Sequence, residues 1–165
     1  MEIVVRMARA GDVPALVRLR IANAERHAGL DPAGHRLPEP DAVRRYFEEL
    51  LGGPAGGSVL VMVAEVSGTV AGMTELVIFP EPPDHQILTS RRLADVHTVV
   101  LDRYRGNGVG KALVAAAERI AAERGVSLLL APILASNTEA VGFYSGAGFG
   151  QRGVILSKEL RADDC

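Results

Sequence analysis

The chain has a single cysteine, Cys165, at its last position, and it has no tryptophan. One cysteine excludes a disulfide framework within the chain and a metal site built from several thiolates. An excess of positive charge is also missing, because 18 Lys and Arg residues stand against 20 Asp and Glu residues. Nucleic-acid-binding domains normally carry a basic face, so we expect no nucleic-acid partner.

Long hydrophobic runs are absent as well. The longest, residues 128–135, contains Pro132 and is far shorter than the roughly 20 residues that span a bilayer. The N-terminus has an acid at Glu2, and its apolar run is too short for a signal peptide. We therefore expect a soluble, cytoplasmic protein with no membrane partner. Its length suits one domain over residues 1–165 with a sizeable core.

The spacing of apolar residues and turn residues predicts a mixture of strands and helices. Asp12 can cap a helix, Gly52-Gly53 can end one, and Ser67-Gly68 is typical of a hairpin turn. The expected strands are residues 3–7, 58–66, 69–79, 93–101, 126–134 and 149–160, and the expected helices are residues 13–27, 41–51, 111–124 and 137–145. Residues 29–40 and 80–92 are expected to be irregular connections.

A glycine-rich segment, Arg103-Tyr-Arg-Gly-Asn-Gly-Val-Gly-Lys111, joins an expected strand to an expected helix. Glycine permits positive φ and lets the main chain approach a phosphate closely. The N-terminus of the following helix offers unpaired N–H groups and the positive end of the helix dipole. The segment therefore predicts an anion site for a phosphorylated ligand. An ordinary strand-to-helix turn is the alternative.

Three types of glycine loop compete for this segment. A P-loop needs a glycine at position 105 and a Ser or Thr at 112, but Arg105 and Ala112 stand there. A dinucleotide fingerprint that begins at Gly106 needs a glycine at 111 and finds Lys111. A third pattern, Arg-x-x-Gly-x-Gly, is met in two overlapping registers, at Arg103, Gly106 and Gly108 and at Arg105, Gly108 and Gly110.

A second motif lies downstream at Asn137-Thr-Glu-Ala-Val-Gly-Phe-Tyr-Ser-Gly-Ala-Gly-Phe149. The two motifs, in this order, resemble those of the Gcn5-related N-acetyltransferase (GNAT) superfamily, in which the first is the pyrophosphate loop for acyl-CoA. The second motif matches at Asn137, Ala140, Phe143, Tyr144, Gly148 and Phe149. The resemblance is specific over residues 99–149 and weak in the first 60 residues. One departure is Asp102, where the family often has proline, and it affects a turn rather than chemistry.

The resemblance implies an α/β (α+β) GNAT fold. Its central sheet would be mixed, mostly antiparallel and twisted, with six to seven strands, about four flanking helices and a splay between the fourth and fifth strands. Pro132 suits that splay because it cannot donate to a strand ladder, although a strand edge or bulge would explain it equally well. Acetyl-CoA is the implied co-substrate, with no metal. The implied CoA-binding residues are Val99, Val100, Arg105, Gly106, Asn107, Gly108, Val109, Gly110, Lys111, Asn137 and Tyr144.

The resemblance also assigns a general acid. Tyr144 would protonate the departing thiolate, since a phenol is protonated at neutral pH; the alternative is a tyrosine packed under the helix. The backbone N–H of Val100 or a neighbour could stabilise the oxyanion. For the general base, Glu75 and His97 are the main candidates and Asp95 a weaker one. Each has a purely structural alternative, and a water relay is a further possibility.

The implied function is transfer of an acetyl group to a primary amine of a small molecule, such as a metabolite, an amino acid derivative or an antibiotic, by direct attack in a ternary complex. In this fold the acceptor site is usually built by the first two helices with their loop, and by the 80–92 connection. The low aromatic content argues against a large stacked substrate. The alternatives are a non-catalytic acyl-CoA-binding regulatory or assembly protein and a protein or peptide N-acetyltransferase. Superfamily members are often dimers, so a homodimer stays open here.

Overall fold

The structure is a computed structural model, and it describes residues 1–54 and 56–160. Within these residues five strands form one sheet in the order β1-β2-β3-β4-β5. The strands are β1 (Ile3–Met7), β2 (Val59–Val66), β3 (Thr69–Ile78), β4 (Arg92–Val100) and β5 (Val126–Leu130), and the α-helices are α1 (Val13–Leu30), α2 (Pro40–Gly52), α3 (Val109–Glu123) and α4 (Thr138–Gly146). Strands β1 to β4 pair antiparallel, and β5 pairs parallel to β4.

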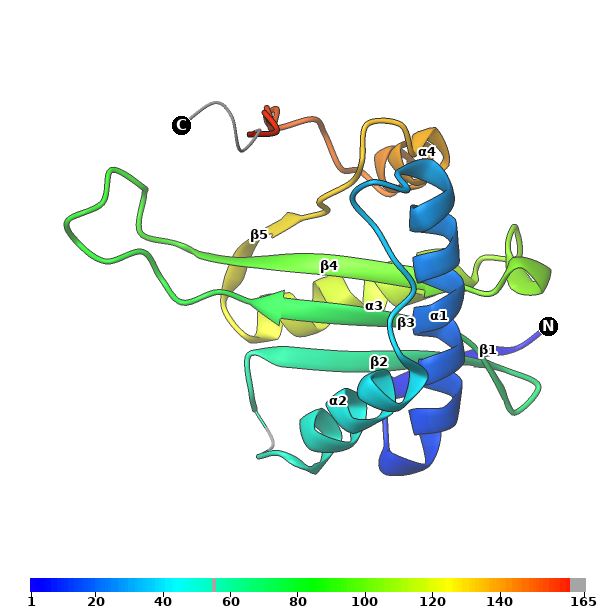
Figure 1. Cartoon of the computed structure of the whole chain (residues 1–165). Coiled ribbons are helices and arrows are strands. Elements are labelled where there is room, and N and C mark those ends of the chain that lie inside the picture. Colours follow the sequence, from blue (N-terminus) through cyan, green and yellow to red (C-terminus); the bar gives the residue numbers. More distant parts are fainter. Residues whose placement is uncertain (55, 161–165) are drawn as a thin grey trace.

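Helices cover both faces of the sheet (Figure 1). On one face, Leu16 and Leu19 of α1 and Phe47 of α2 pack against residues of β2, β3 and β4 such as Val63. On the other face, α3 and Tyr144 of α4 pack against the same strands. The sheet is therefore the middle layer of three. The mixed, mostly antiparallel architecture expected from the sequence is confirmed.

The β4 and β5 strands part from one another after a short stretch of pairing. Their register runs from Arg92 opposite Val126 to Asp95 opposite Leu130. Beyond Asp95, β4 continues to Val100 and pairs with β3 alone among the described strands. Pro132 follows two residues after β5 ends, where no ladder N–H is needed. The splay expected between the fourth and fifth strands is therefore present.

Two sequence expectations need correction in this region. Residues 126–134 were expected to form one strand, but β5 ends at Leu130 because the parting of the strands removes its partner. Residues 149–160 were expected to be a further strand, but the described residues 150–160 lie in no strand and are exposed. A β-prone segment forms a strand only where it pairs with a neighbouring edge, and no such pairing occurs within the described residues. The described sheet thus has five strands rather than six to seven.

Turn residues set the ends of the elements much as the sequence predicts. Ser67 and Gly68, with φ of 49° and 74°, make the hairpin between β2 and β3. Gly108, with φ of 84°, precedes α3, which begins at Val109 rather than at the expected Lys111. Within residues 1–54 and 56–160, no helix combines the length and the apolar composition needed to cross a bilayer.

Candidate active site

A cleft of about 410 Å³ opens where β4 leaves β5. Four parts of the fold line it: the last turns of α1, the second half of β4, the glycine loop with the start of α3, and α4 with the segment before it. The charged side chains among its described lining residues are Arg26, Arg105, Lys111 and Glu139. Three cations and one carboxylate give the cleft a positive balance, which suits an anionic ligand.

The glycine loop forms one end of this cleft. Gly106 and Gly108 have φ of 72° and 84°, a left-handed conformation that side chains other than glycine rarely adopt. The first bond within α3 runs from the Ala112 N–H to the Gly108 carbonyl oxygen at 3.0 Å. The N–H groups of Val109, Gly110 and Lys111 therefore have no acceptor inside the helix. This cradle of amides at a helix N-terminus fits a pyrophosphate by its donor chemistry.

Two close contacts keep the loop and its helix in position. A Cβ added at Gly110 would lie 3.0 Å from the ring of Phe143, so the glycine lets α3 approach α4 closely. Nε of Arg105 donates to the Val100 carbonyl oxygen at 3.1 Å, which holds the loop to the end of β4. Asn107 bonds within the loop, its side-chain amide donating to the Arg105 carbonyl oxygen. Backbone and packing together thus fix the amide cradle against the strand.

Tyr144 reaches the cleft from α4. Its side chain is only 7% exposed, and its ring makes edge contacts with Phe143 and Phe149 at about 5 Å between centroids. The hydroxyl lies 3.5 Å from the carbonyl oxygen of Val96, to which it can donate. Burial raises the pKa of Tyr144 above its usual value, and contacts with Thr98 oppose this rise. The phenol is therefore a proton donor throughout the neutral range.

The β4 backbone offers donors to the same space. Leu101 donates its N–H to the Ala71 carbonyl oxygen on the β3 side, so in an antiparallel ladder the N–H of Val100 points to the opposite side. That side is the gap left by β5, toward which the Val96 carbonyl also points. The N–H groups of Thr98 and Val100 are therefore turned toward the gap. Both residues line the cleft.

The three candidate bases lie on the face of the sheet that α1 and α2 cover. His97 stands opposite Glu75 in the β3–β4 register, and Asp95 precedes it on the same strand face. His97 lines the cleft, and its Nε2 is 4.0 Å from Oδ2 of Asp95. Burial raises the pKa of Asp95. Glu75, His97 and Asp95, the three candidate bases from the sequence, therefore lie near one another on one face of the sheet.

Glu75 differs from His97 in its partners. It is 8% exposed, and its two oxygens accept from Nη2 of Arg20 at 2.8 and 2.7 Å. The hydroxyl of Tyr46 lies 3.4 Å from Oε1 of Glu75. Glu75 is not among the residues that line the cleft. Its carboxylate is therefore held in an ion pair between the sheet and α1.

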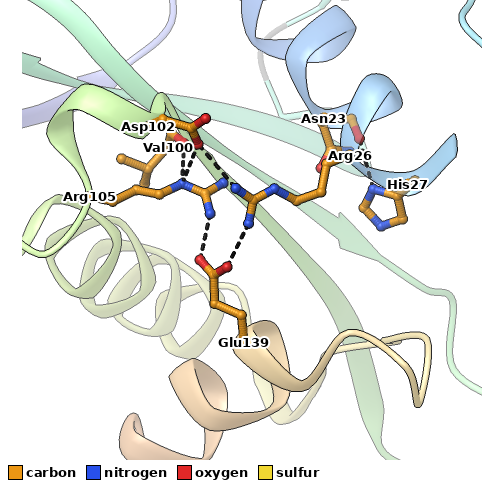
Figure 2. Close-up of polar contacts among 7 residues, drawn as sticks. All are labelled: Asn23, Arg26, His27, Val100, Asp102, Arg105 and Glu139. Carbon is orange, nitrogen blue, oxygen red and sulfur yellow. Dashed lines mark hydrogen bonds and ion pairs between the residues drawn. The ribbon is translucent and has the colours of Figure 1, made fainter. Parts of the chain in front are cut away.

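An ion-pair network spans the cleft from α1 to α4 (Figure 2). Oε1 of Glu139 accepts from Nη1 of Arg105 at 2.5 Å, and Oε2 accepts from Nη1 of Arg26 at 2.9 Å. Oδ1 of Asp102 accepts from Nη2 of Arg26 at 3.1 Å and lies 3.1 Å from Nε of Arg105. Figure 2 shows the two guanidinium groups facing each other, with the carboxylates on opposite sides. Both guanidinium groups are thus held at the cleft by the two acids.

Most residues expected at the CoA site line this one cleft. They are Val99, Val100, Arg105, Gly106, Gly108, Val109, Gly110, Lys111, Asn137 and Tyr144. Asn107 is not among the lining residues, and Asn137 also caps α4 by accepting from the Ala140 N–H at 3.2 Å. Sequence reasoning missed Asn23 and Arg26 of α1 and did not assign His27 to the site. Their spacing of i, i+3 and i+4 on one helix face was the available signal.

No group of three or more His, Cys, Asp or Glu side chains that could hold a metal ion occurs within residues 1–54 and 56–160.

Comparison with known proteins agrees with this geometry. A model of the Acetyltransferase (GNAT) family matches residues 21–149. A variant of the BH1408 protein from Bacillus halodurans superposes with a TM-score of 0.85 at 18% identity, covering 96% of this chain and 99% of that chain. No curated protein matches the chain.

Two structures of N-acetyltransferases share the fold. The aminoglycoside N-acetyltransferase AAC(6')-Iy in complex with CoA has a TM-score of 0.72 at 19% identity, covering 98% of this chain and 96% of that chain. The glucosamine-6-phosphate N-acetyltransferase from Arabidopsis thaliana has a TM-score of 0.68 at 17% identity, covering 98% and 100%.

Proposed function

The chain belongs to the acetyltransferase (GNAT) family, and we propose that it moves the acetyl group of acetyl-CoA to a primary amine of a small molecule. The observation that carries this proposal is the shared cleft. The amide cradle, the Tyr144 hydroxyl and the unpaired edge of β4 all face one space with a positive balance of charge. These are the groups that a thioester-to-amine transfer needs.

The donor would be held by backbone rather than by side chains alone. The amides of Val109, Gly110 and Lys111 suit the pyrophosphate, and Arg26 and Arg105 add cations in the same cleft. Asn137 and the β4 edge would position the rest of the donor. When bound, acetyl-CoA supplies an activated acyl group as a thioester. The CoA-bound structure of AAC(6')-Iy, which has the same fold, supports this choice of donor.

The reaction would proceed by direct attack in a ternary complex. The amine nitrogen attacks the thioester carbonyl carbon, the C–N bond forms, and the C–S bond breaks. The N–H groups of Thr98 and Val100, turned toward the gap, would stabilise negative charge on the carbonyl oxygen. Tyr144 would give its proton to the departing sulfur. Its raised pKa keeps that proton available at neutral pH.

The amine must lose a proton, and His97 is our preferred acceptor for it. His97 is half-exposed and lines the cleft, so water and an amine can both reach its ring. Oδ2 of Asp95 lies 4.0 Å from Nε2 of the ring, so a carboxylate stands beside it. Glu75 is a weaker candidate because Arg20 already occupies both of its oxygens. A water chain from the amine to this cluster is the other route.

The acceptor would enter from the side of α1 and α2. His97 and Glu75 face that side, and Asn23 and His27 of α1 line the cleft next to it. A small acceptor is favoured because the cleft must hold the reacting ends of both substrates in about 410 Å³. A non-catalytic acyl-CoA-binding protein is the second candidate. It would need the amide cradle but not Tyr144 or His97.

Ligand-induced thermal stabilisation tests the proposal first. Acetyl-CoA, CoA, ATP and NADPH are compared at equal concentration with purified protein. A ligand at 100 times its dissociation constant stabilises by about 2.7 kcal/mol, a shift that is readily measured. We expect acetyl-CoA and CoA to raise the melting temperature and the other two to leave it unchanged. Release of free thiol with a panel of primary amines then separates an enzyme from a binder. Stabilisation by ATP alone, or by none of the four, would refute the donor assignment.

A further inference from the structure

Thr74 is a buried polar residue that the proposed reaction does not use. It lies in the middle of β3 and is fully buried. Because side chains alternate along a strand, it shares the face of Leu76, which belongs to the core under α3. Its Oγ1 donates to the His97 carbonyl oxygen at 3.1 Å and lies 3.0 Å from Oγ1 of Thr98. One partner of this buried hydroxyl is therefore a residue that lines the cleft.

Thr98 connects Thr74 to the cleft. The two threonines stand directly opposite each other in the β3–β4 register, so their side chains lie on the same face of the sheet. Val96, two residues before Thr98 on that face, belongs to the same core cluster as Tyr144. Thr98 and Tyr144 both line the cleft. The threonine pair is thus on the face from which Tyr144 enters the cleft.

The Tyr144 hydroxyl has few polar neighbours. Its hydrogen bond to the Val96 carbonyl oxygen is long, at 3.5 Å. The side chain and the main chain of Thr98 both lower the pKa of Tyr144, against the rise that burial causes. No charged side chain of residues 1–54 and 56–160 adds to these effects. A hydrogen bond that stabilises the ionised form lowers a pKa, so Thr98 is placed to donate to the Tyr144 phenolate.

The hydroxyl protons of the two threonines have a defined direction before the reaction. A carbonyl oxygen can only accept, so the Thr74 proton points to His97 and Thr98 is the donor in the 3.0 Å contact. The lone pairs of Thr98 are then open to the phenol proton. Once Tyr144 has lost its proton, both hydroxyls can rotate. Thr74 then donates to Thr98, and Thr98 donates to the phenolate.

We propose that Thr98, supported by Thr74, is a positioning residue for Tyr144, whose hydroxyl it accepts from before the transfer and whose phenolate it donates to afterwards. The O–H bond of Tyr144 breaks, its proton passes to the departing sulfur, and CoA leaves as a thiol. The phenolate regains a proton from water after the products leave. Neither threonine gains or loses a proton. This role rests on the proposed acetyl transfer, whereas the contact between Thr98 and Tyr144 requires no ligand.

Ionisation of Tyr144 in the free protein tests the contact. Incorporation of 3-fluorotyrosine, a more acidic phenol, brings the titration below alkaline unfolding, and fluorine NMR follows the three tyrosines. Tyr144→Phe assigns the signal. Thr98→Val keeps the branched shape and the main-chain N–H but removes the hydroxyl, so we expect the acid dissociation constant of Tyr144 to fall about tenfold. Thr98→Ser should restore it. Thr69→Val, at the exposed start of β3, is the matched control. An unchanged titration in Thr98→Val would overturn the proposal.

A double-mutant cycle tests the role in the transfer. Thr98→Val should lower kcat about tenfold and leave the affinity for acetyl-CoA unchanged, and Thr98→Ser should recover activity. In a Tyr144→Phe background the same substitution should have no further effect, because the threonine acts through the phenol. Thr74→Val should cause a smaller loss than Thr98→Val. Urea unfolding confirms that each variant is folded.

An equal loss of kcat in both backgrounds would show a merely structural role and would overturn the proposal. Failure of the proposed function gives a different result. The wild type would then neither bind acetyl-CoA nor release thiol, and the transfer role of Thr98 would fall with it. The titration of Tyr144 would still measure the contact with Thr98, because it uses the protein without substrates.

Discussion

Nη1 of Arg26 lies 2.9 Å from Oε2 of Glu139, and this ion pair joins α1 to α4 across the cleft. The same carboxylate binds Arg105, so one acid holds two cations that line the cleft. Phosphate groups prefer guanidinium partners for the same reason that a carboxylate does. Glu139 is therefore placed to compete with an anionic ligand for Arg26 and Arg105.

Substitution of Arg26 should weaken CoA binding, and substitution of Glu139 should strengthen it. Arg26→Gln removes a charge-assisted contact, and we expect CoA to bind about five- to tenfold more weakly, equivalent to roughly 1–1.4 kcal/mol. Glu139→Gln should bind CoA more tightly, because the competing carboxylate is gone. Titration calorimetry at low salt measures both. Pantetheine, which lacks the phosphates, should show neither change, and Arg18→Gln on the same helix is the control variant. Equal effects on pantetheine would contradict this interpretation.

Loss of the Tyr144 hydroxyl should separate chemistry from binding. Tyr144→Phe keeps the ring packing with Phe143 and Phe149, so the fold and CoA affinity should be unchanged within about a factor of two. We expect kcat to fall by about 100- to 1000-fold, the range for removal of a general acid. Thiol release measures kcat, and calorimetry measures CoA binding. A wild-type kcat in Tyr144→Phe would mean that the sulfur leaves without this proton.

The two main candidate bases should respond differently to substitution. His97→Gln should lower kcat/KM near neutral pH while leaving stability nearly unchanged, because the ring is half-exposed. Glu75→Gln should destabilise the fold, by about 1–3 kcal/mol, because it leaves Arg20 without its charged partner. Arg20→Met combined with Glu75→Gln should recover part of that loss. Urea unfolding and pH–rate profiles provide the two readouts. A stable Glu75→Gln variant with no activity would make Glu75 the base.

Gly72 should tolerate no side chain. A Cβ at this position would lie 2.8 Å from the Val99 carbonyl oxygen and 3.0 Å from Leu113, and the carbonyl cannot move without displacing β4. Gly72→Ala should therefore lower the free energy of unfolding by about 1–3 kcal/mol. Gly142→Ala is the matched control, since it is helical and has nothing within 4 Å of the added Cβ. That variant should be neutral or up to about 1 kcal/mol more stable. Equal stability of the two variants would refute the close approach.

Asp12 should contribute a pH-dependent part of the stability. Its hydrogen bonds from Arg6, and a further one from the Arg9 N–H, hold the pKa of Asp12 below its usual value. A lowered pKa in the folded state stabilises above the unfolded-state pKa, about 3.9, and this stabilisation disappears as pH falls through the folded-state pKa. Asp12→Asn should cost about 1–3 kcal/mol at pH 7.

The difference between wild type and Asp12→Asn should shrink as the pH falls below about 4. Urea titrations at neutral and acidic pH measure it. Asp41→Asn, at an exposed carboxylate, is the control and should change stability by less than about 1 kcal/mol at any pH. If the difference in unfolding free energy between wild type and Asp12→Asn stayed constant across this pH range, the ion-pair explanation would be contradicted.

Much of the site could be predicted because its signals are local. The glycines at 106, 108 and 110 specify a turn that precedes a helix, and the predicted positive φ occurs at Gly106 and Gly108. Pro132 marks the point where β5 can no longer pair. The clustering of Glu75 and His97 follows from strand alternation once two strands are adjacent. Each of these predictions depends on properties of a few neighbouring residues.

Other features had no such local signal. The strand expected at residues 149–160 failed because its formation depends on a partner edge, not on its own composition. The partner of Glu75 is Arg20, 55 residues away, and the partner of Arg26 is Glu139, 113 residues away. A polar residue on a helix face predicts solvent exposure as readily as an ion pair. Only the packing of α1 against the rest of the fold shows which acid each arginine pairs with.

The sequence by itself determined the glycine loop, the tyrosine motif and the order of the first five strands and the four helices, because backbone preferences and short-range spacing specify them. The tertiary structure decided which charges meet, which candidate base is free and which strand sequence remains unpaired. Those outcomes depend on how α1 and α4 pack against the parted strands β4 and β5. Packing brings together residues whose separation along the chain carries no periodic signal.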